Sequence, residues 1–279
     1  MTSDSAGMPE ALTRRAEALL TGDTAAWTAP DTKDSATVIL LRDSEVGPQT
    51  FLQRRVGSMK FAAGMYVFPG GRVEPQDADP QVPWRGDPAA EPFRQPDGAS
   101  ITATFRAVTV AAARETWEEA AVVLGANASG APLSDTPSAP DVDVIDWLRE
   151  CGGAVNAADL IPWAHWVTPE VERHRYDTRF LAVALPAGQA ALDLGVESDN
   201  SLWISPEAAL VEAKAGTMPM LPPTFDALER LVGYGTVIDA LAAADPDPLP
   251  LMPRAIRTPQ GNIRWAIVDA YSDEVLREL

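Results

Sequence analysis

Three glutamates of this chain have a spacing that brings them together if their segment is helical. Glu115, Glu118 and Glu119 stand at positions i, i+3 and i+4, which share one face of an α-helix. Like charges at this spacing destabilise an isolated helix by about 0.2–0.5 kcal/mol per pair, so a merely solvated face gains nothing from them. A bound hard cation makes this arrangement favourable, because Mg²⁺ is coordinated by oxygen ligands and several carboxylates can bind the same ion. The triplet therefore predicts a helix that carries a cation site.

Two upstream features extend the triplet into a longer motif. A Phe-Pro-Gly-Gly run ends at Gly71, Asp77 follows, and an Arg-Glu-x-x-Glu-Glu run begins at Arg114. This order resembles the Nudix hydrolase pattern, in which glycine, glutamate and an Arg-Glu-hydrophobe-x-Glu-Glu-x-Gly-hydrophobe run follow one another. Asp77 stands where the pattern has its first glutamate. The resemblance implies an α/β fold, a Nudix α/β/α sandwich around a mixed β-sheet.

The motif is interrupted, and the interruption points to a subgroup. Residues 78–113 occupy 36 positions where the pattern has seven, an insertion of 29. Downstream runs at 175–180 (Arg-Tyr-Asp-Thr-Arg-Phe), 203–208 (Trp-Ile-Ser-Pro-Glu-Ala) and 222–225 (Pro-Pro-Thr-Phe) accompany it. Together they are similar to coenzyme A diphosphatases of the peroxisomal type, over about residues 35–232. The bacterial coenzyme A signature, His-x-Gly-Gln before Phe-Pro-Gly-Gly, is absent, which leaves the substrate open.

The ends of the carboxylate helix are also predicted. The inserted segment from Ile101 onward has the small and apolar residues of a helix, so we expect the helix to begin near Ser100 or Thr102. Ala121 replaces the glycine that usually ends it, and alanine favours continuation. Gly125 is the better stop, because glycine readily takes the left-handed conformation. The helix is therefore expected to run about one turn beyond the usual end.

The resemblance assigns roles to the motif residues. It implies that Glu115, Glu118, Glu119 and a Gly70 carbonyl bind Mg²⁺ or Mn²⁺, and that Arg114 orients the glutamates by ion pairing. It also implies that one glutamate acts as the base, with Glu115 as the leading candidate, although spacing alone does not separate base from ligand. Glycine at positions 70 and 71 suits a loop that approaches a metal closely, because it lacks a Cβ.

Binding of a phosphate substrate requires cationic side chains near the cleft in which the metal ion is expected. Arg54, Arg55 and Arg72 flank it, and guanidinium groups bind phosphate in a bidentate manner. Strand alternation sends Arg54 and Arg55 to opposite faces, so at most one of them points inward. With Gly71, these arginines form the predicted substrate-binding set. Many Nudix enzymes also use a further downstream carboxylate, for which Glu197 and Asp199 are the candidates.

Composition limits the function classes. A net charge of −18 argues against binding to nucleic acid or to an anionic membrane, because either partner requires a basic patch. Cys151 is the only cysteine, so no intrachain disulfide is expected. His165 and His174 are the only histidines, which leaves carboxylates as the available catalytic groups. With no signal peptide or apolar span predicted, we expect a cytoplasmic protein.

The chain is expected to divide into an N-terminal helical arm (1–34), a Nudix domain (35–215, with 75–100 as an inserted surface loop) and a helical C-terminal extension (216–279). Strands are predicted at 37–41, 50–55, 65–68, 163–167, 179–185, 202–204 and 266–268, with helices at 8–20, 141–150, from 206, and over much of 224–244. The expected partner is a small nucleotide-derived substrate. The resemblance also suggests a homodimer, but the sequence does not decide the oligomeric state.

The predicted function is metal-dependent hydrolysis of the diphosphate in a nucleoside diphosphate linked to another moiety. Coenzyme A or its acyl derivatives lead the substrate candidates, and ADP-ribose or NADH is the alternative. A non-catalytic Nudix-fold ligand sensor is a second class, but a sensor does not need an intact triplet of glutamates. A Nudix-like diphosphate isomerase is a third class. It would need a catalytic cysteine near the cleft, and Cys151 lies in a turn after a later helix.

Overall fold

The computed structural model describes residues 10–57, 62–86, 93, 101–139, 141–195 and 198–278. Within these residues the main sheet has ten strands in the order β10-β2-β1-β9-β8-β11-β12-β13, with β3 paired to β2 and β4 paired to β1. β1 is parallel to β9 and antiparallel to β2 and β4, so the sheet is mixed. A second sheet of three strands has the order β5-β7-β6.

The strands of the main sheet are β1 (Lys33–Ser44), β2 (Gly47–Arg55), β3 (Tyr66–Val67), β4 (Gly70–Arg72), β8 (Ile161–Val167), β9 (Tyr176–Ala184), β10 (Ser198–Ile204), β11 (Pro250–Arg257), β12 (Ile263–Asp269) and β13 (Val275–Glu278). Those of the small sheet are β5 (Trp84–Arg85), β6 (Gly125–Ala126) and β7 (Ala154–Asn156). The helices are α1 (Glu10–Thr21), η1 (Pro75–Ala78), α2 (Ile101–Ala120), α3 (Val144–Cys151), η2 (Ala157–Asp159), α4 (Pro206–Ala215), α5 (Pro222–Glu229) and α6 (Val237–Ala242). Each strand and helix predicted from the sequence has a counterpart among them.

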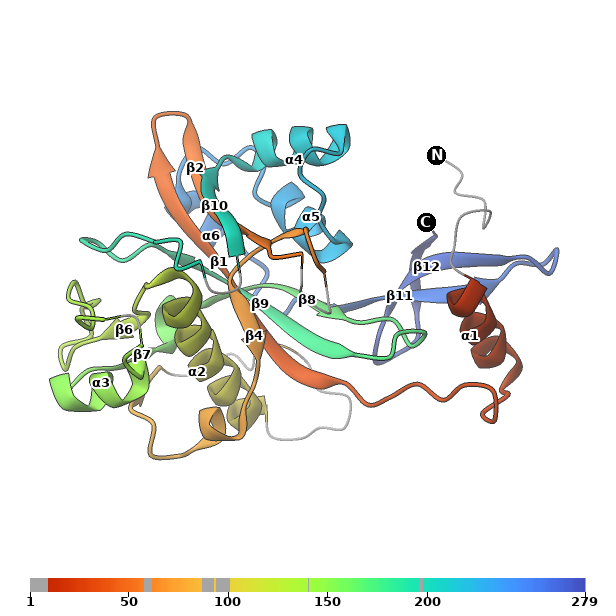
Figure 1. The fold of residues 1–279 in the computed structure, drawn as a ribbon, viewed down its shortest axis with the longest axis horizontal. Coiled ribbons are helices and arrows are strands. Elements are labelled where there is room, and N and C mark those ends of the chain that lie inside the picture. The colour runs from red at the N-terminus through yellow and green to blue at the C-terminus, as the bar shows by residue number, and fades with distance from the viewer. Residues whose placement is uncertain are drawn as a thin grey trace.

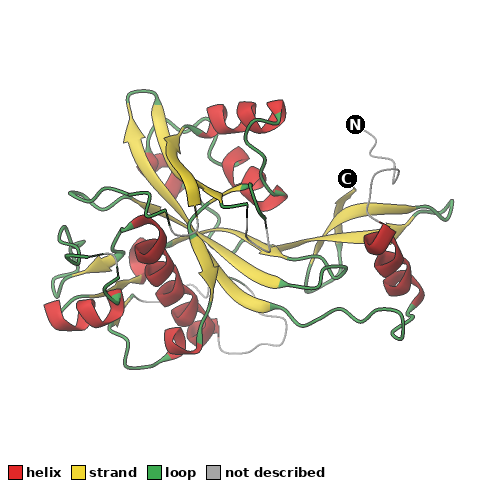
Figure 2. Cartoon of the chain, in the orientation of Figure 1, coloured by secondary structure: helices red, strands yellow, loops and turns green. Residues whose placement is uncertain are grey.

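Helices cover both faces of the main sheet, which confirms the predicted α/β/α sandwich (Figures 1 and 2). Alternate residues of β1 belong to two separate cores: Val38 and Leu40 pack with α2 and α3, whereas Ile39 and Leu41 pack with α4, α5 and α6. A strand buried on both faces has an unbroken apolar sequence, as this one does. The catalytic-helix candidate α2 therefore lies against the centre of the sheet.

The carboxylate helix begins as predicted but ends earlier. α2 starts at Ile101 and stops at Ala120, and Ala121 adopts a left-handed conformation with φ of +55°. The expected extension to Gly125 is wrong. Val122 and Val123 are fully buried in the core, and Gly125 begins strand β6, which pairs with β7. Burial and pairing thus outweigh the roughly 1–2 kcal/mol that a left-handed alanine costs.

The described part of the inserted segment is more than a surface loop, so that expectation does not hold there. η1 and β5 give it regular structure, and Asp77, Val82 and Phe93 are buried. Residues 87–92 and 94–100 of the insertion lie outside the described part of the chain. The segment is anchored because its few large side chains enter the core shared with α2.

The C-terminal segment is mixed rather than purely helical. Its helices α5 and α6 cover one face of the sheet, and β11 continues the sheet in parallel with β8. α1 packs near β11 and β12 at the end of the sheet remote from α2 (Figure 1). None of the helices in the described residues is long and apolar enough to cross a membrane.

Candidate active site

The three glutamates of α2 line one cavity, as their spacing predicts. The cavity has a volume of about 150 Å³, and we call it the carboxylate cavity. Its lining residues come from β2, α2, the segment before β10 and the start of β10: Gln53, Glu115, Glu118, Glu119, Leu194, Gly195 and Ser198. The site thus lies between the C-terminal half of α2 and the face of the sheet that α2 covers.

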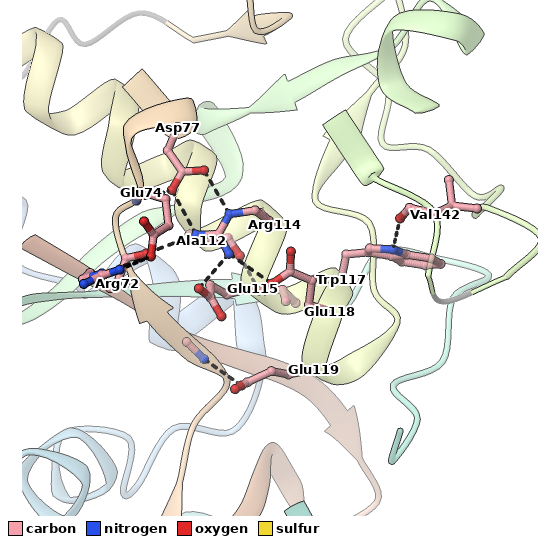
Figure 3. Close-up of polar contacts among 12 residues, drawn as sticks. Arg72, Glu74, Asp77, Ala112, Arg114, Glu115, Trp117, Glu118, Glu119 and Val142 are labelled. Atoms are coloured by element: carbon pink, nitrogen blue, oxygen red, sulfur yellow. Dashed lines mark hydrogen bonds and ion pairs between the residues drawn. The ribbon is translucent and has the colours of Figure 1, made fainter. Parts of the chain in front are cut away.

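Arg114 is the centre of an ion-pair cluster beside this cavity. Its Nε and Nη2 donate to the two carboxylate oxygens of Asp77 at 3.0 and 2.9 Å. Its Nη1 donates to Glu115 at 2.7 Å and to Glu118 at 3.0 Å, and Nη2 also contacts the Arg72 carbonyl. Figure 3 shows the guanidinium between Asp77 and these two glutamates. The Arg114 guanidinium thus lies within hydrogen-bond distance of both Glu115 and Glu118.

The electrostatics of the cluster favour a further positive charge. Burial raises the pKa of Glu115, and the nearby carboxylates of Glu118 and Asp77 raise it further, while Arg114 opposes the shift. Burial also raises the pKa of Glu118. One guanidinium therefore does not fully compensate the carboxylates around it.

Glu119 is held by a different group. Its Oε2 accepts a hydrogen bond of 2.9 Å from the Gly70 backbone N–H, and Figure 3 shows the side chain directed away from Arg114. β4, which contains Gly70 and Gly71, pairs with β1, so this amide is fixed by the centre of the sheet. The structure thus brings together the Phe-Pro-Gly-Gly run and the helix, as the motif predicts.

Both glycines of β4 are required by close approach. A Cβ at Gly71 would lie 2.3–2.6 Å from the carboxylate atoms of Glu115. Gly70 has φ of +155°, and a Cβ there would lie 2.3 Å from the Ala36 carbonyl oxygen. Glycine is therefore needed at these positions to bring β4 against β1 and against the carboxylates.

The predicted substrate arginines lie outside the lining of the carboxylate cavity. Arg54 pairs with Asp199 at 2.6 Å, and Arg72 pairs with Glu74 at 2.5 Å, on exposed surfaces. Because Gln53 faces α2, alternation directs Arg54 to the other face of β2 and Arg55 to the same face as Gln53. Of the two downstream carboxylate candidates, Asp199 is bound to Arg54, and Glu197 lies outside the described residues.

Two residues of the site were absent from the predicted set. Asp77 is 1% exposed and forms a bidentate ion pair with Arg114, and its place in the motif was the signal for it. Gln53 is 4% exposed, and its Nε2 donates to the Glu119 carbonyl at 2.8 Å. A polar residue inside an otherwise buried strand was the only sequence signal for Gln53.

The donors of the cavity suit a hard divalent ion. The lining residues supply carboxylate, amide and hydroxyl oxygens and include no thiol or imidazole. In the described residues, however, no three His, Cys, Asp or Glu side chains are arranged to hold a metal ion. The hydrogen bonds account for this, because Arg114 bridges Glu115 and Glu118 while Glu119 is turned to Gly70. Metal binding at the cavity thus requires some of these carboxylates to exchange partners.

Comparison with known proteins finds relatives that are named Nudix hydrolases. No family model matches the chain. It is 27% identical over 188 residues to nudix hydrolase 7 of Caenorhabditis elegans, and the matched region covers 66% of this chain and 55% of that protein. It is 24% identical over 231 residues to the acyl-coenzyme A diphosphatase NUDT19 of Xenopus laevis, and the matched region covers 68% of this chain and 61% of that protein. The chain thus spans less than two thirds of the length of both relatives.

A solved structure gives the same assignment. A NUDIX hydrolase from Alicyclobacillus acidocaldarius superposes with a TM-score of 0.64 at 28% sequence identity, covering 78% of this chain and 99% of that one. An α/β/α sandwich with an Arg-Glu-x-x-Glu-Glu helix beside a Gly-Gly strand is the architecture that the motif implies. In motif, fold and sequence the chain is similar to Nudix hydrolases.

Proposed function

We propose that this protein is a metal-dependent diphosphatase that hydrolyses a nucleoside diphosphate linked to another moiety. The observation that carries the proposal is the shared cavity of Glu115, Glu118 and Glu119 beside the two glycines of β4. Coenzyme A or an acyl derivative is the leading substrate, supported by the interrupted motif and by the relative named acyl-coenzyme A diphosphatase. ADP-ribose and NADH are the alternative substrates.

The reaction is the attack of water on one phosphorus of the diphosphate. The new P–O bond forms as the bridging P–O bond breaks, and the proton of the water passes to a carboxylate of the cavity, which yields two phosphate monoesters. Glu115 is the proposed base, because burial raises its pKa towards that of a useful proton acceptor and Arg114 fixes its position. Arg114 holds Glu118 in the same way.

The proposed cofactor is Mg²⁺ or Mn²⁺, held by Glu115, Glu118, Glu119 and the Gly70 carbonyl. A divalent ion held by these residues would neutralise charge on the phosphate oxygens and would lower the pKa of the attacking water. To bind this ion, Glu119 must either give up its hydrogen bond to the Gly70 amide or coordinate the ion through the carboxylate oxygen that this amide does not contact. Leu194 and Gly195 also line this cavity.

A hydrolysis screen tests the proposal. Wild-type protein is incubated with coenzyme A, acetyl-coenzyme A, ADP-ribose, NADH and a dinucleoside polyphosphate, with Mg²⁺ or Mn²⁺ and with EDTA. We expect metal-dependent release of two phosphate monoesters, fastest from a coenzyme A substrate. Glu118→Gln should abolish turnover without changing the unfolding midpoint. Lack of hydrolysis throughout the panel would favour the ligand-sensor alternative, and a rearranged product would favour an isomerase.

The isomerase alternative has a separate test at the lone thiol. Cys151 ends α3, is exposed, and is outside the carboxylate cavity. We therefore expect Cys151→Ser to turn over the best substrate of the screen at the wild-type rate. A large loss of turnover in this variant would argue that the thiol acts in the reaction.

A further inference from the structure

The C-terminal end of α2 is held by groups that come from outside the helix. The last carbonyl oxygens of an α-helix have no partner within the helix and need external donors. In α2, the Gln53 side chain of β2 donates to the Glu119 carbonyl at 2.8 Å. The Leu192 backbone N–H, from the segment before β10, donates to the Ala120 carbonyl at 2.9 Å. The catalytic helix is thus capped by the sheet and by the segment that precedes β10.

These caps coincide with an unusual helix stop. Ala121 takes the left-handed conformation at the position where glycine would adopt it without strain. An alanine stop is maintained only if the surrounding structure holds it. Gln53 and Leu192 donate to the two residues immediately before Ala121, so they are placed to provide that support.

Gln53 is a rigid support. It lies inside β2, paired with Val67 of β3 on one side and Ser201 of β10 on the other. Its side chain is buried, and a buried amide is costly unless it is hydrogen-bonded. Its one bond to α2 therefore fixes the height of the last helical turn above the sheet.

The residue fixed in this way is Glu119. Its carbonyl is held by Gln53, while its carboxylate is held by Gly70. We propose that Gln53 is a positioning residue of the reaction, which sets the orientation of Glu119 by capping the catalytic helix in place of the absent glycine. The proposal rests on the proposed function, because it assigns Glu119 to metal binding.

The test replaces the donor by an apolar side chain of similar size. Gln53→Leu is compared with wild type and with Gln49→Leu, a glutamine of the same strand that lies outside the cavity and instead accepts hydrogen bonds from Arg42. Three quantities are measured: amide hydrogen exchange of the peptide 116–124, the Kd for Mn²⁺, and kcat with KM for the best substrate. The double variant Gln53→Leu/Ala121→Gly is included as a rescue.

For Gln53→Leu we expect faster exchange at 116–124, a Kd for Mn²⁺ raised about 10–100-fold, and a loss in kcat larger than the change in KM. Gln49→Leu should match wild type. Ala121→Gly should restore much of the Mn²⁺ affinity of Gln53→Leu, because glycine ends the helix without the cap. That rescue is not expected if Gln53 acts only by contacting a ligand.

Two results would overturn the proposal. Unchanged exchange at 116–124 in Gln53→Leu would show that Gln53 does not hold the helix end. Faster exchange with wild-type Mn²⁺ affinity and kcat would show that the cap has no part in positioning Glu119. A wild-type protein that neither binds Mn²⁺ nor hydrolyses the panel would instead refute the proposed function, while the exchange measurement would still report on the cap.

Discussion

Arg114 and Asp77 form a two-point ion pair that bridges the insertion within the motif. Two hydrogen bonds of 3.0 and 2.9 Å join them, and Asp77 also accepts a bond of 2.8 Å from the Glu74 backbone N–H. Burial would lower the pKa of Arg114, but Asp77 and Glu115 raise it, so the guanidinium stays charged. η1, at the start of the inserted segment, packs against α2, so the paired residues of the motif stay in contact across the insertion.

Removing this pair should destabilise the protein. Asp77→Asn leaves the buried guanidinium without its bidentate acceptor, and breaking a buried pair costs about 3–5 kcal/mol. We expect a loss near the low end of that range in urea unfolding, because Glu115 and Glu118 still accept from Arg114. The control Asp79→Asn removes an exposed carboxylate 3.8 Å from Arg149 and should change stability by less than about 0.5 kcal/mol. Equal stabilities for the two variants would contradict the bridging role of Asp77.

A methyl group at Gly71 should impair catalysis more than folding. The Cβ of Gly71→Ala would overlap the Glu115 carboxylate, which must move by about 1 Å, and a displacement of that size can cost roughly 100-fold in rate. Turnover of the best substrate measures the effect, with circular dichroism as the folding check. Gly235→Ala is the matched control, since no atom lies within 4 Å of its added Cβ. Wild-type turnover in Gly71→Ala would show that Glu115 tolerates another position.

The parts of the site that were predictable from sequence are those fixed by local spacing. Glu115, Glu118 and Glu119 share a face because helical periodicity alone puts them there. Gln53 reaches the cavity through sheet register, which one sequence does not reveal. Alternation along β2 predicted that Arg54 and Arg55 diverge, but not that Asp199 binds Arg54.

The helix end was mispredicted for a similar reason. Intrinsic propensity favours continuation through Ala121, and only the tertiary structure reverses it. Val122 and Val123 enter the core, and residues remote in sequence supply the missing hydrogen bonds. The same limit applies to the insertion, where Phe93 is buried although the surrounding composition is that of a loop.

A buried polar cluster lies away from the carboxylate cavity. His165 and Tyr271 both hydrogen-bond to the Asp177 carboxylate, and Arg179 contacts Asp177 and Asp34. Burial lowers the pKa of His165, whose Nδ1 has no hydrogen-bond partner in the described part of the chain. Burial alone would raise the pKa of Asp177, but His165, Arg179 and Tyr271 together lower it.

Both shifts make the fold sensitive to acid. A lowered pKa in the folded state means that the unfolded chain binds protons first, so stability is lost as pH falls. The loss from His165 should begin below about pH 6.5, and that from Asp177 near pH 4. We expect the thermal midpoint to drop between pH 7 and 5, and to drop less in His165→Gln. His174→Gln, which changes the exposed histidine, should keep the wild-type slope; equal slopes in all three proteins would contradict the assignment to His165.

Replacing Ala121 by glycine should stabilise the protein. A left-handed alanine costs about 1–2 kcal/mol, whereas the extra freedom of glycine in the unfolded chain costs about 0.4–1 kcal/mol. The balance favours Ala121→Gly by roughly 0.5–1 kcal/mol in urea unfolding, because φ of +55° suits glycine. The same substitution inside α2, Ala113→Gly, should destabilise by about 1–2 kcal/mol, since glycine is a poor helix former and a buried methyl group is lost. Destabilisation of both variants by similar amounts would mean that Ala121 is not strained.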